Sequence, residues 1–251
     1  MANAMKYSSY HFLLCGLIVA LITPVTAYAF KLVPMSVKMA PSGRGATESF
    51  VVDNSGAKPI AVEMKVFVRS MTEDGEDILT EEEDDFVVFP SQMVIMPGES
   101  QVVRLQWLGQ QDPERELAYR LIAEQLPLNL DEEVIDGGRI YVLFRYVASV
   151  YIVPKRRLHA DVKITDAYIE GGEVNQLVVF VKNEGTKHSI LRDATLKLKS
   201  STSSFELGTE QLPGLAGANI LVGHSRKFVL PAPAGSQAGA LDAELQYYGQ
   251  K

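Results

Sequence analysis

The side chains that most often carry catalysis or bind metals are few in this sequence and poorly spaced for either task. Three histidines lie beyond the N-terminal region, and no two of them have the His-x-x-x-His spacing of metal ligands. Cys15 is the only cysteine, so the chain has no cysteine pair for a metal or an internal disulfide. We expect no metal and no cofactor, and we expect a surface position for His188, which follows the turn residues 183–187.

Motifs for nucleophilic catalysis, phosphate binding and calcium binding are also missing. The sequence has no Gly-x-Ser-x-Gly elbow, and its Gly43-Arg44-Gly45 segment lacks the Lys-Ser/Thr of a phosphate loop. The acidic segments 73–77 and 81–85 lack the Asp-x-Asp-x-Asp-Gly order of a calcium loop, so they predict a solvated loop and strand edge. We therefore predict no catalytic residues and a protein that is not an enzyme.

The overall charge narrows the class of partner. The 251 residues include 24 Lys and Arg against 31 Asp and Glu, which gives a formal net charge of -7. A protein that binds nucleic acid backbones usually presents a basic face, so we expect no nucleic-acid partner. The hydrophobic content of 47% is that of an ordinary globular protein.

The N-terminal segment has the layout of a secretory signal peptide. Lys6 precedes an apolar run from Phe12 to Ile22, and the segment closes with Ala27-Tyr28-Ala29. The apolar run is about half of the roughly 20 residues that a membrane-spanning helix needs, which argues against an anchor. We expect residues 1–29 to be cleaved off and the mature protein to lie in the periplasm.

The remaining chain is dominated by period-two alternation, which is typical of half-buried β-strands. Short alternating runs are separated by Gly, Pro, Asn or Asp, and no long helical stripe occurs. The pattern predicts an all-β protein built from antiparallel sandwiches. In the first half the expected strands are 50–52, 60–68, 86–89, 93–96, 102–107 and 117–126.

One run is unlike the others. Residues 139–153 form a strand-like stretch without a breaker, which would extend roughly 50 Å at about 3.3 Å per residue. It ends at Pro154 and a short basic segment, after which alternation restarts at Val162. We predict an N-terminal domain over 30–154 and a second β-sandwich over 158–251.

Several segments of the first half, taken in order, resemble the periplasmic chaperones of chaperone–usher pilus assembly. The most specific pair is Pro-Gly-x-x-Gln-x-x-Arg at 97–104 with the Arg-Glu, Tyr-Arg and Leu-Pro pattern at 115–127. The resemblance covers about residues 30–157 and is weaker beyond them. It implies two immunoglobulin-like sandwich domains in an L-shaped arrangement.

The resemblance also implies donor-strand complementation, in which the long strand fills the open groove of an incomplete pilin sandwich. Counted back from Pro154, the family's donor positions fall on Ile140, Val142 and Phe144, and Tyr146 continues that face. We expect the opposite face, with Tyr141, Leu143 and Val147, to pack into the protein's own core. A long strand that is buried on both faces within one protein is the alternative.

The family's clamp for the carboxylate at the subunit's C-terminus is altered here. The lysine position, five residues before Pro154, is Ser149, and the arginine position falls near Val37. This departure resembles the archaic-type branch of the family. The candidate replacements are Arg120, Arg145 and Lys38.

The expected partners are pilin-like subunits and an outer-membrane usher. Self-association through the exposed donor strand is a further expectation, because unpaired strand edges pair readily. The alternative function is a structural or adhesive surface protein made of two immunoglobulin-like domains. In that protein the long strand would be paired permanently within its own sheet.

Overall fold

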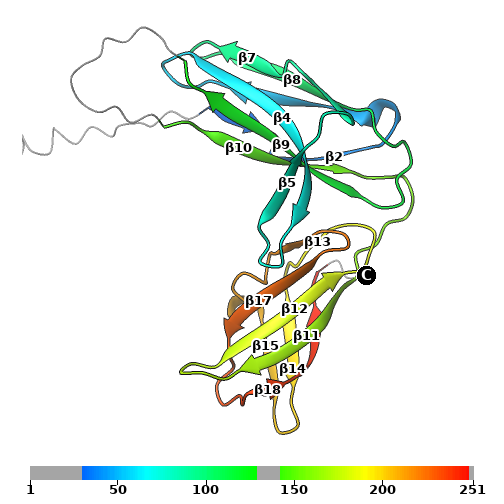
Figure 1. Cartoon of the computed structure of the whole chain (residues 1–251), viewed down its shortest axis with the longest axis vertical. Coiled ribbons are helices and arrows are strands. Elements are labelled where there is room, and N and C mark those ends of the chain that lie inside the picture. The colour runs from blue at the N-terminus through cyan, green and yellow to red at the C-terminus, as the bar shows by residue number, and fades with distance from the viewer. Residues whose placement is uncertain (1–29, 129–141, 249–251) are drawn as a thin grey trace, which may run out of the picture.

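The computed structural model describes residues 30–128 and 142–248, and these residues form two β-sandwiches (Figure 1). The only helices among the described residues are two short 3-10 helices, Gly43–Ala46 and Thr209–Gln211. The predicted all-β class is therefore confirmed. In the described part of the chain, no helix combines the length and apolar character required to span a membrane.

The first sandwich pairs a four-stranded sheet with a six-stranded sheet. The four-stranded sheet has the order β1-β3-β8-β6, and the larger sheet has the order β2-β10-β9-β4-β5, with β7 also paired to β4. The strands of the smaller sheet are β1 (Lys31–Val33), β3 (Thr47–Asp53), β6 (Phe86–Phe89) and β8 (Ser100–Trp107). Those of the larger sheet are β2 (Ser36–Met39), β4 (Ile60–Met71), β5 (Asp77–Glu81), β7 (Gln92–Ile95), β9 (Leu117–Leu126) and β10 (Arg145–Ile152).

Alternating apolar residues of both sheets meet in the core of this sandwich. In β3 the inward side chains Phe50 and Val52 are fully buried, while Val51 between them is exposed. The same alternation buries Val103 and Leu105 of β8. Period-two patterning therefore identifies both the strands and their buried faces.

The second sandwich consists of smaller sheets around its own core. The sheet orders are β17-β12-β11-β18, β15-β14-β19 and β13-β16. Its strands are β11 (Val162–Glu170), β12 (Gln176–Asn183), β13 (Ser189–Ile190), β14 (Thr195–Lys199), β15 (Ser204–Leu207), β16 (Asn219–Ile220), β17 (Ser225–Pro231), β18 (Gly239–Ala240) and β19 (Asp242–Gln246). The core is separate from the first and includes Leu177, Val179, Leu196 and Leu198.

A bend separates the two sandwiches, and polar contacts cross it. In Figure 1 strands β4 and β9 of the first sandwich slope down to the right, whereas β11, β12 and β17 of the second slope up to the right. The hairpin between β4 and β5 reaches the second sandwich, where the backbone N–H of Lys227 donates to the carbonyl of Glu73 at 2.7 Å. This hairpin therefore connects the larger sheet of the first sandwich to β17.

Candidate functional site

Strand β10 carries one apolar face whose burial decreases steadily toward the strand's start. Ala148, Val150 and Ile152 are completely buried in the core of the first sandwich. On the same side, Phe144 and Tyr146 are only partly buried against that core. Val142, the next residue of the series, precedes the start of β10 at Arg145 and is 65% exposed. The apolar face of β10 thus extends beyond the sandwich that it stabilises.

This arrangement corrects one expectation from the sequence. Val147 lies outside the core cluster, on the face of β10 that carries Ser149 and Tyr151. Leu143 is 46% exposed, and Tyr141 lies outside the described residues. The protein's own core is packed by the same face that carries Phe144 and Tyr146, because alternate residues of a strand point to one side along its whole length.

The backbone of β10 is unpaired along part of one edge. One edge of the strand pairs with β9 from Arg145 to Ile152, and the other pairs with β2 only from Ser149 onward. Gln125 donates its N–H to the carbonyl of Phe144 at 2.9 Å, so the backbone groups of Arg145 and Val147 point away from β9. No described strand pairs with them there. We call residues 145–148 the open edge.

Of the cations proposed from the sequence, Arg120 lies at the end of the open edge. It sits opposite Ser149 in the β9–β10 pair, and its Nη1 donates to the hydroxyl of Ser149. Its Nε donates to Oδ2 of Asp77 at 2.7 Å. The Arg120 side chain keeps 16% of its surface exposed, so it is accessible at the wall of the bend between the sandwiches.

The other two proposed cations lie further along the same face. Arg145 is exposed at the start of β10 opposite Glu124, about 13 Å from Ser149 at roughly 3.3 Å per residue. Lys38 is exposed on β2, where it pairs in register with Tyr151. The structure therefore places the three cations on three neighbouring strands at three different levels, and it does not bring them together around one point.

Two residues that the sequence interpretation missed complete the surroundings of Arg120. The carboxylate of Asp77 bridges two guanidinium groups, because its Oδ1 accepts from Nε of Arg69 at 2.8 Å. The Arg69 side chain is only 6% exposed. Asp77 was expected in a solvated loop or strand edge; it begins the edge strand β5, but its side chain is paired with two arginines and only 21% exposed. Alternation in 60–68 places Arg69 on the face of β4 opposite the core of the first sandwich, so nothing in the sequence pattern indicated its burial, and its partner depends on the pairing of β4 with β5.

The two arginines change the acidity of Asp77. Burial raises the pKa of this carboxyl group, but the hydrogen bonds from Arg120 and Arg69 and their charges outweigh burial, so the net pKa is lowered. Asp77 is therefore ionised at neutral pH and neutralises part of the positive charge of the pair. We call Arg69, Asp77, Arg120 and Ser149 the arginine cluster.

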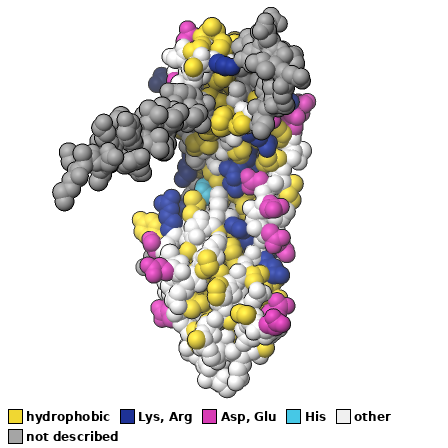
Figure 2. Space-filling view, turned by 90° about the vertical axis from the view of Figure 1, so that its left-hand side faces the viewer, with side chains coloured by type: hydrophobic (Ala, Val, Ile, Leu, Met, Phe, Trp, Pro, Cys, Tyr) yellow, Lys and Arg dark blue, Asp and Glu magenta, His cyan; other side chains and the backbone are white. Residues whose placement is uncertain are grey.

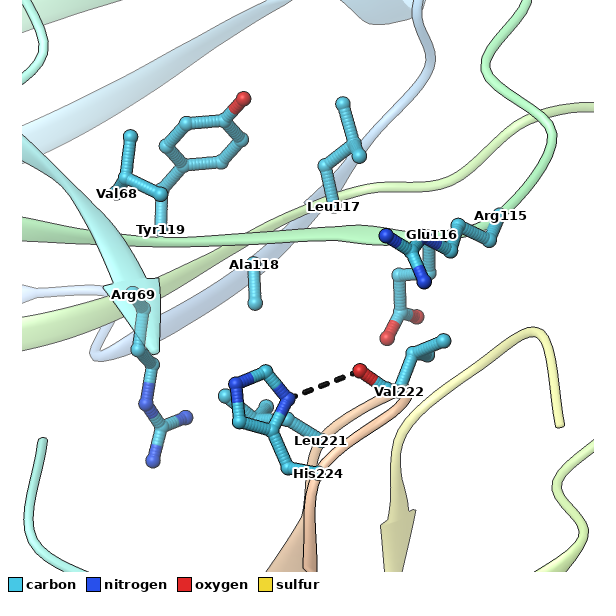
Figure 3. Close-up of a pocket in the computed structure, with 10 residues that line it drawn as sticks. All are labelled: Val68, Arg69, Arg115, Glu116, Leu117, Ala118, Tyr119, Leu221, Val222 and His224. Atoms are coloured by element: carbon cyan, nitrogen blue, oxygen red, sulfur yellow. Dashed lines mark hydrogen bonds between the residues drawn. The ribbon is translucent and has the colours of Figure 1, made fainter. Parts of the chain in front are cut away.

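A cleft of about 180 Å³ lies beside this cluster, between the sandwiches (Figure 3). Residues 115–119 line its first-sandwich side, and Leu221, Val222 and His224 line the other. In Figure 3 the ring of His224 points across the cleft, and its Nδ1 lies 2.9 Å from the carbonyl oxygen of Val222. Figure 2 shows Lys and Arg side chains gathered around this middle part of the molecule.

His188 is another departure from expectation, because it is not a surface residue. Its side chain is 12% exposed, its Nδ1 lies 2.5 Å from Oε1 of Glu116, and its ring stacks on Tyr151 with centroids 4.1 Å apart. The hydroxyl of Tyr151 accepts hydrogen bonds from Arg69 at 3.2 Å and Asn219 at 2.9 Å. These contacts fix the junction between the sandwiches.

Within the described ranges, no three or more His, Cys, Asp or Glu side chains are grouped so that they could hold a metal ion. The chemistry of the site is instead that of a strand edge with an apolar face and arginines at its end. Such an arrangement suits β-strand addition with recognition of a carboxylate.

The family comparison gives the class of this two-sandwich protein. Residues 32–157 match the model described as "Pili and flagellar-assembly chaperone, PapD N-terminal domain". The match spans half of the chain, so the protein belongs to this family of chaperone–usher pilus chaperones. No curated protein matches the chain by sequence.

Solved structures support the fold. One is the CsuC–CsuE chaperone and tip adhesion subunit pre-assembly complex from the archaic Csu pili of Acinetobacter baumannii, with a TM-score of 0.58 and 16% identity. The similarity covers 86% of this chain and 97% of the matched chain. The class 5 fimbriae chaperone CfaA has a TM-score of 0.52 and 16% identity, with coverage of 87% and 99%. The complex of the Salmonella enterica SafA pilin with the SafB chaperone has a TM-score of 0.51 and 13% identity, with coverage of 89% and 98%.

Proposed function

We propose that this protein binds pilin-like subunits by donating β10 to their incomplete sandwiches, and that it delivers them to an outer-membrane usher. The observation that carries the proposal is the decline in burial along alternate apolar residues, from Ile152 in β10 at 0% exposure to Val142, just before β10, at 65%. A strand that served only its own sandwich would gain nothing from an apolar face beyond its core, where exposed Val and Phe invite aggregation.

In this proposal the donor residues are Ile140, Val142, Phe144 and Tyr146. Ile140 lies outside the described residues. The ring of Tyr146 packs edge-on against Phe30 with centroids 4.7 Å apart, so this residue anchors the donor segment to its own sandwich. Val142 and Phe144 would supply the side chains that enter the subunit's groove. The open edge would supply the backbone hydrogen bonds of the added sheet pair.

The open edge also limits where an added strand can end. Strand β2 occupies the same edge of β10 from Ser149 onward and runs parallel to β10. A subunit strand that runs parallel to β10 must therefore stop at the level of Ser149, with its C-terminal carboxylate beside Arg120. For this reason we propose Arg120 as the principal anchor, while Lys38 and Arg145 are secondary candidates.

Delivery to an usher requires a surface that the subunit leaves free. On the outer face of the smaller sheet, Val33, Val51 and Val102 are neighbours across three paired strands, and each is more than a third exposed. Phe89 beside them is 72% exposed. We propose this apolar row as the usher-facing surface.

We also propose that residues 1–29 direct the chain to the periplasm.

The proposal is tested by co-expressing the chain with pilin-like candidates in a periplasm and measuring native complexes by mass spectrometry. The wild type should form a one-to-one complex, and Val142→Asp should lose most of it because a carboxylate would have to enter an apolar groove. Val174→Asp is the matched control, because Val174 is also exposed, at 78%, but lies in the second sandwich between β11 and β12.

Two results would contradict the proposal. If Val142→Asp retained its subunit as well as Val174→Asp did, the donor face would be wrong. If no small subunit co-purified with the wild type, the two-domain structural or adhesive protein would be the better account. Val142 is largely exposed, so its substitution should leave folding intact, which circular dichroism would verify.

A further inference from the structure

We infer that Asp77 is an internal stand-in for a ligand carboxylate: it occupies Arg120 in the free protein and gives this arginine up when a ligand carboxylate arrives. The inference rests on the proposed function for its biological meaning, since the ligand there is the C-terminal carboxylate of a bound subunit. It assigns a specificity role to Asp77 and Arg69, which were not among the sequence candidates.

The first argument is the way in which the Asp77 carboxylate is shared. Each of its oxygens contacts a different arginine, and both contacts are made through Nε, at 2.8 Å to Arg69 and 2.7 Å to Arg120. Neither arginine forms the two-pronged pair that guanidinium and carboxylate groups prefer. A second carboxylate that takes Arg120 in two-pronged geometry would therefore replace one hydrogen bond with two.

The second argument concerns the charge left behind after such an exchange. Asp77 would keep its contact with Arg69, whose side chain is 6% exposed and also donates to the Tyr151 hydroxyl. Both the internal carboxylate and the buried arginine would stay paired while Arg120 changes partner. Leaving a buried charge without a partner is strongly unfavourable, and the second arginine avoids that cost.

The third argument is the local balance of charge. Arg226 lies near enough for the charge of Arg69 to add to burial in lowering the pKa of Arg226, although the charge of Asp74 opposes this shift. Two arginines thus share one bridging carboxylate and a third lies close to Arg69, in a protein whose formal net charge is -7. The excess of positive charge favours an additional anion at this point, although the chain as a whole is acidic.

The alternative is that Asp77 only orients Arg120 or staples the β4–β5 hairpin. The two accounts predict different effects of Asp77 neutralisation on carboxylate affinity. A stand-in competes with a ligand carboxylate, so its neutralisation should strengthen carboxylate binding. An orienting residue holds Arg120 in place, so its neutralisation should weaken binding or leave it unchanged.

Acetate is a suitable probe, because it presents a carboxylate without a subunit. Its binding would be followed through the side-chain Nε–H signal of Arg120 in heteronuclear NMR spectra of the full mature chain near neutral pH, assigned by its loss in Arg120→Lys. We expect acetate to bind Asp77→Asn at least fivefold more tightly than the wild type. Acetamide, which is neutral, should shift the signal in neither protein.

Asp112→Asn is the matched control. Asp112 also pairs with an arginine, Arg156, at 2.7 Å, but this pair is exposed and lies in loops outside the strands that form the open edge. The control should bind acetate as the wild type does. Equal or weaker acetate binding by Asp77→Asn would overturn the inference, provided that its backbone spectrum shows a folded protein.

The acetate titration separates the inference from the proposed function. If subunits bind and depend on Val142 but Asp77→Asn gains no affinity for acetate, only the stand-in is wrong. If Asp77→Asn gains affinity but no subunit ever co-purifies, the carboxylate exchange stands and the chaperone assignment of the edge fails. A second variant, Asp77→Ser, guards against an effect peculiar to the asparagine amide.

Discussion

At the scale of single residues, the main finding is a carboxylate that is shared by two arginines. Asp77 bridges Arg69 and Arg120, and Arg120 also bonds the hydroxyl of Ser149 at the end of the open edge. Where the family's clamp has a lysine, this chain has that serine. The serine contributes no charge of its own, but it accepts from an arginine that reaches across from the neighbouring strand β9.

The ionisation of Asp77 predicts a pH dependence of stability. Its folded pKa is lowered below the usual 3.8, so the stabilisation it provides is present above that value and is lost as pH falls through the folded pKa. Urea unfolding of wild type and Asp77→Asn should therefore differ most at pH 6 and converge as the pH falls below about 4. A constant difference across this range would show that Asp77 acts through its shape and not its charge.

Burial alone would shift this group in the other direction. If desolvation dominated, the folded pKa would be raised, and the wild type would gain stability relative to Asp77→Asn as the pH falls. The Asp112→Asn variant serves again as a control, because its exposed ion pair should add little at any pH.

At the scale of elements, β10 performs two tasks with one face. Its later residues complete the core of the first sandwich, and its earlier residues continue the same apolar face outward. We expect Ile152→Ala to lower the free energy of unfolding by about 2–5 kcal/mol, because Ile152 is fully buried. Val142→Ala should change the free energy by less than about 0.5 kcal/mol, since Val142 is mostly exposed.

Chemical unfolding of the isolated protein measures both values. A large loss for Val142→Ala would mean that Val142 packs within the protein, and the division of β10 into two tasks would then be wrong. Addition of a binding subunit should reverse the order of importance, because complex formation buries the outer residue and leaves the inner one as it was.

The sequence predicted elements better than it predicted the relations between them. Alternation located β6 at Phe86–Phe89 and β9 at Leu117–Leu126 as the structure has them. Alternation did not show which face of β10 packs into the core, and Val147 was assigned to the wrong face. Both faces of this strand are largely apolar, so the sequence pattern does not distinguish them. The arginine cluster was only partly predicted, because Arg69, Asp77 and Arg120 meet through the pairing of three strands. The spacing of residues along the chain does not reveal which strands pair.

At the scale of the whole molecule, the junction between the sandwiches is built around Tyr151. It stacks on His188, and its hydroxyl accepts from Arg69 and Asn219, so one side chain joins both sandwiches to the arginine cluster. The neighbouring apolar contact with Met71 and Leu221 supports it. The junction is therefore a specific contact, even though the two cores are separate.

Removal of the Tyr151 hydroxyl should loosen this junction. Tyr151→Phe leaves the donors of Arg69 and Asn219 without their acceptor, and we expect a loss of about 1–2 kcal/mol in the free energy of unfolding. Calorimetry should also show a broader or divided transition, because the two sandwiches would unfold with less coupling. Tyr168→Phe is the control, since the Tyr168 hydroxyl bonds no described residue; equal effects of the two variants would contradict this view of the junction.

The position of β2 has one more consequence. Because β2 covers β10 from Ser149 onward, the last residue of an added strand always lies at the same level of β10. The position of every other residue of that strand is therefore fixed by its distance in sequence from the C-terminus. Under the proposed mode of binding, each earlier residue of the added strand is then assigned to a side by its count from the carboxylate. Partners of this protein would be recognisable by the phase of apolar residues in their final strand, counted from the C-terminus, even where their sequences share nothing else.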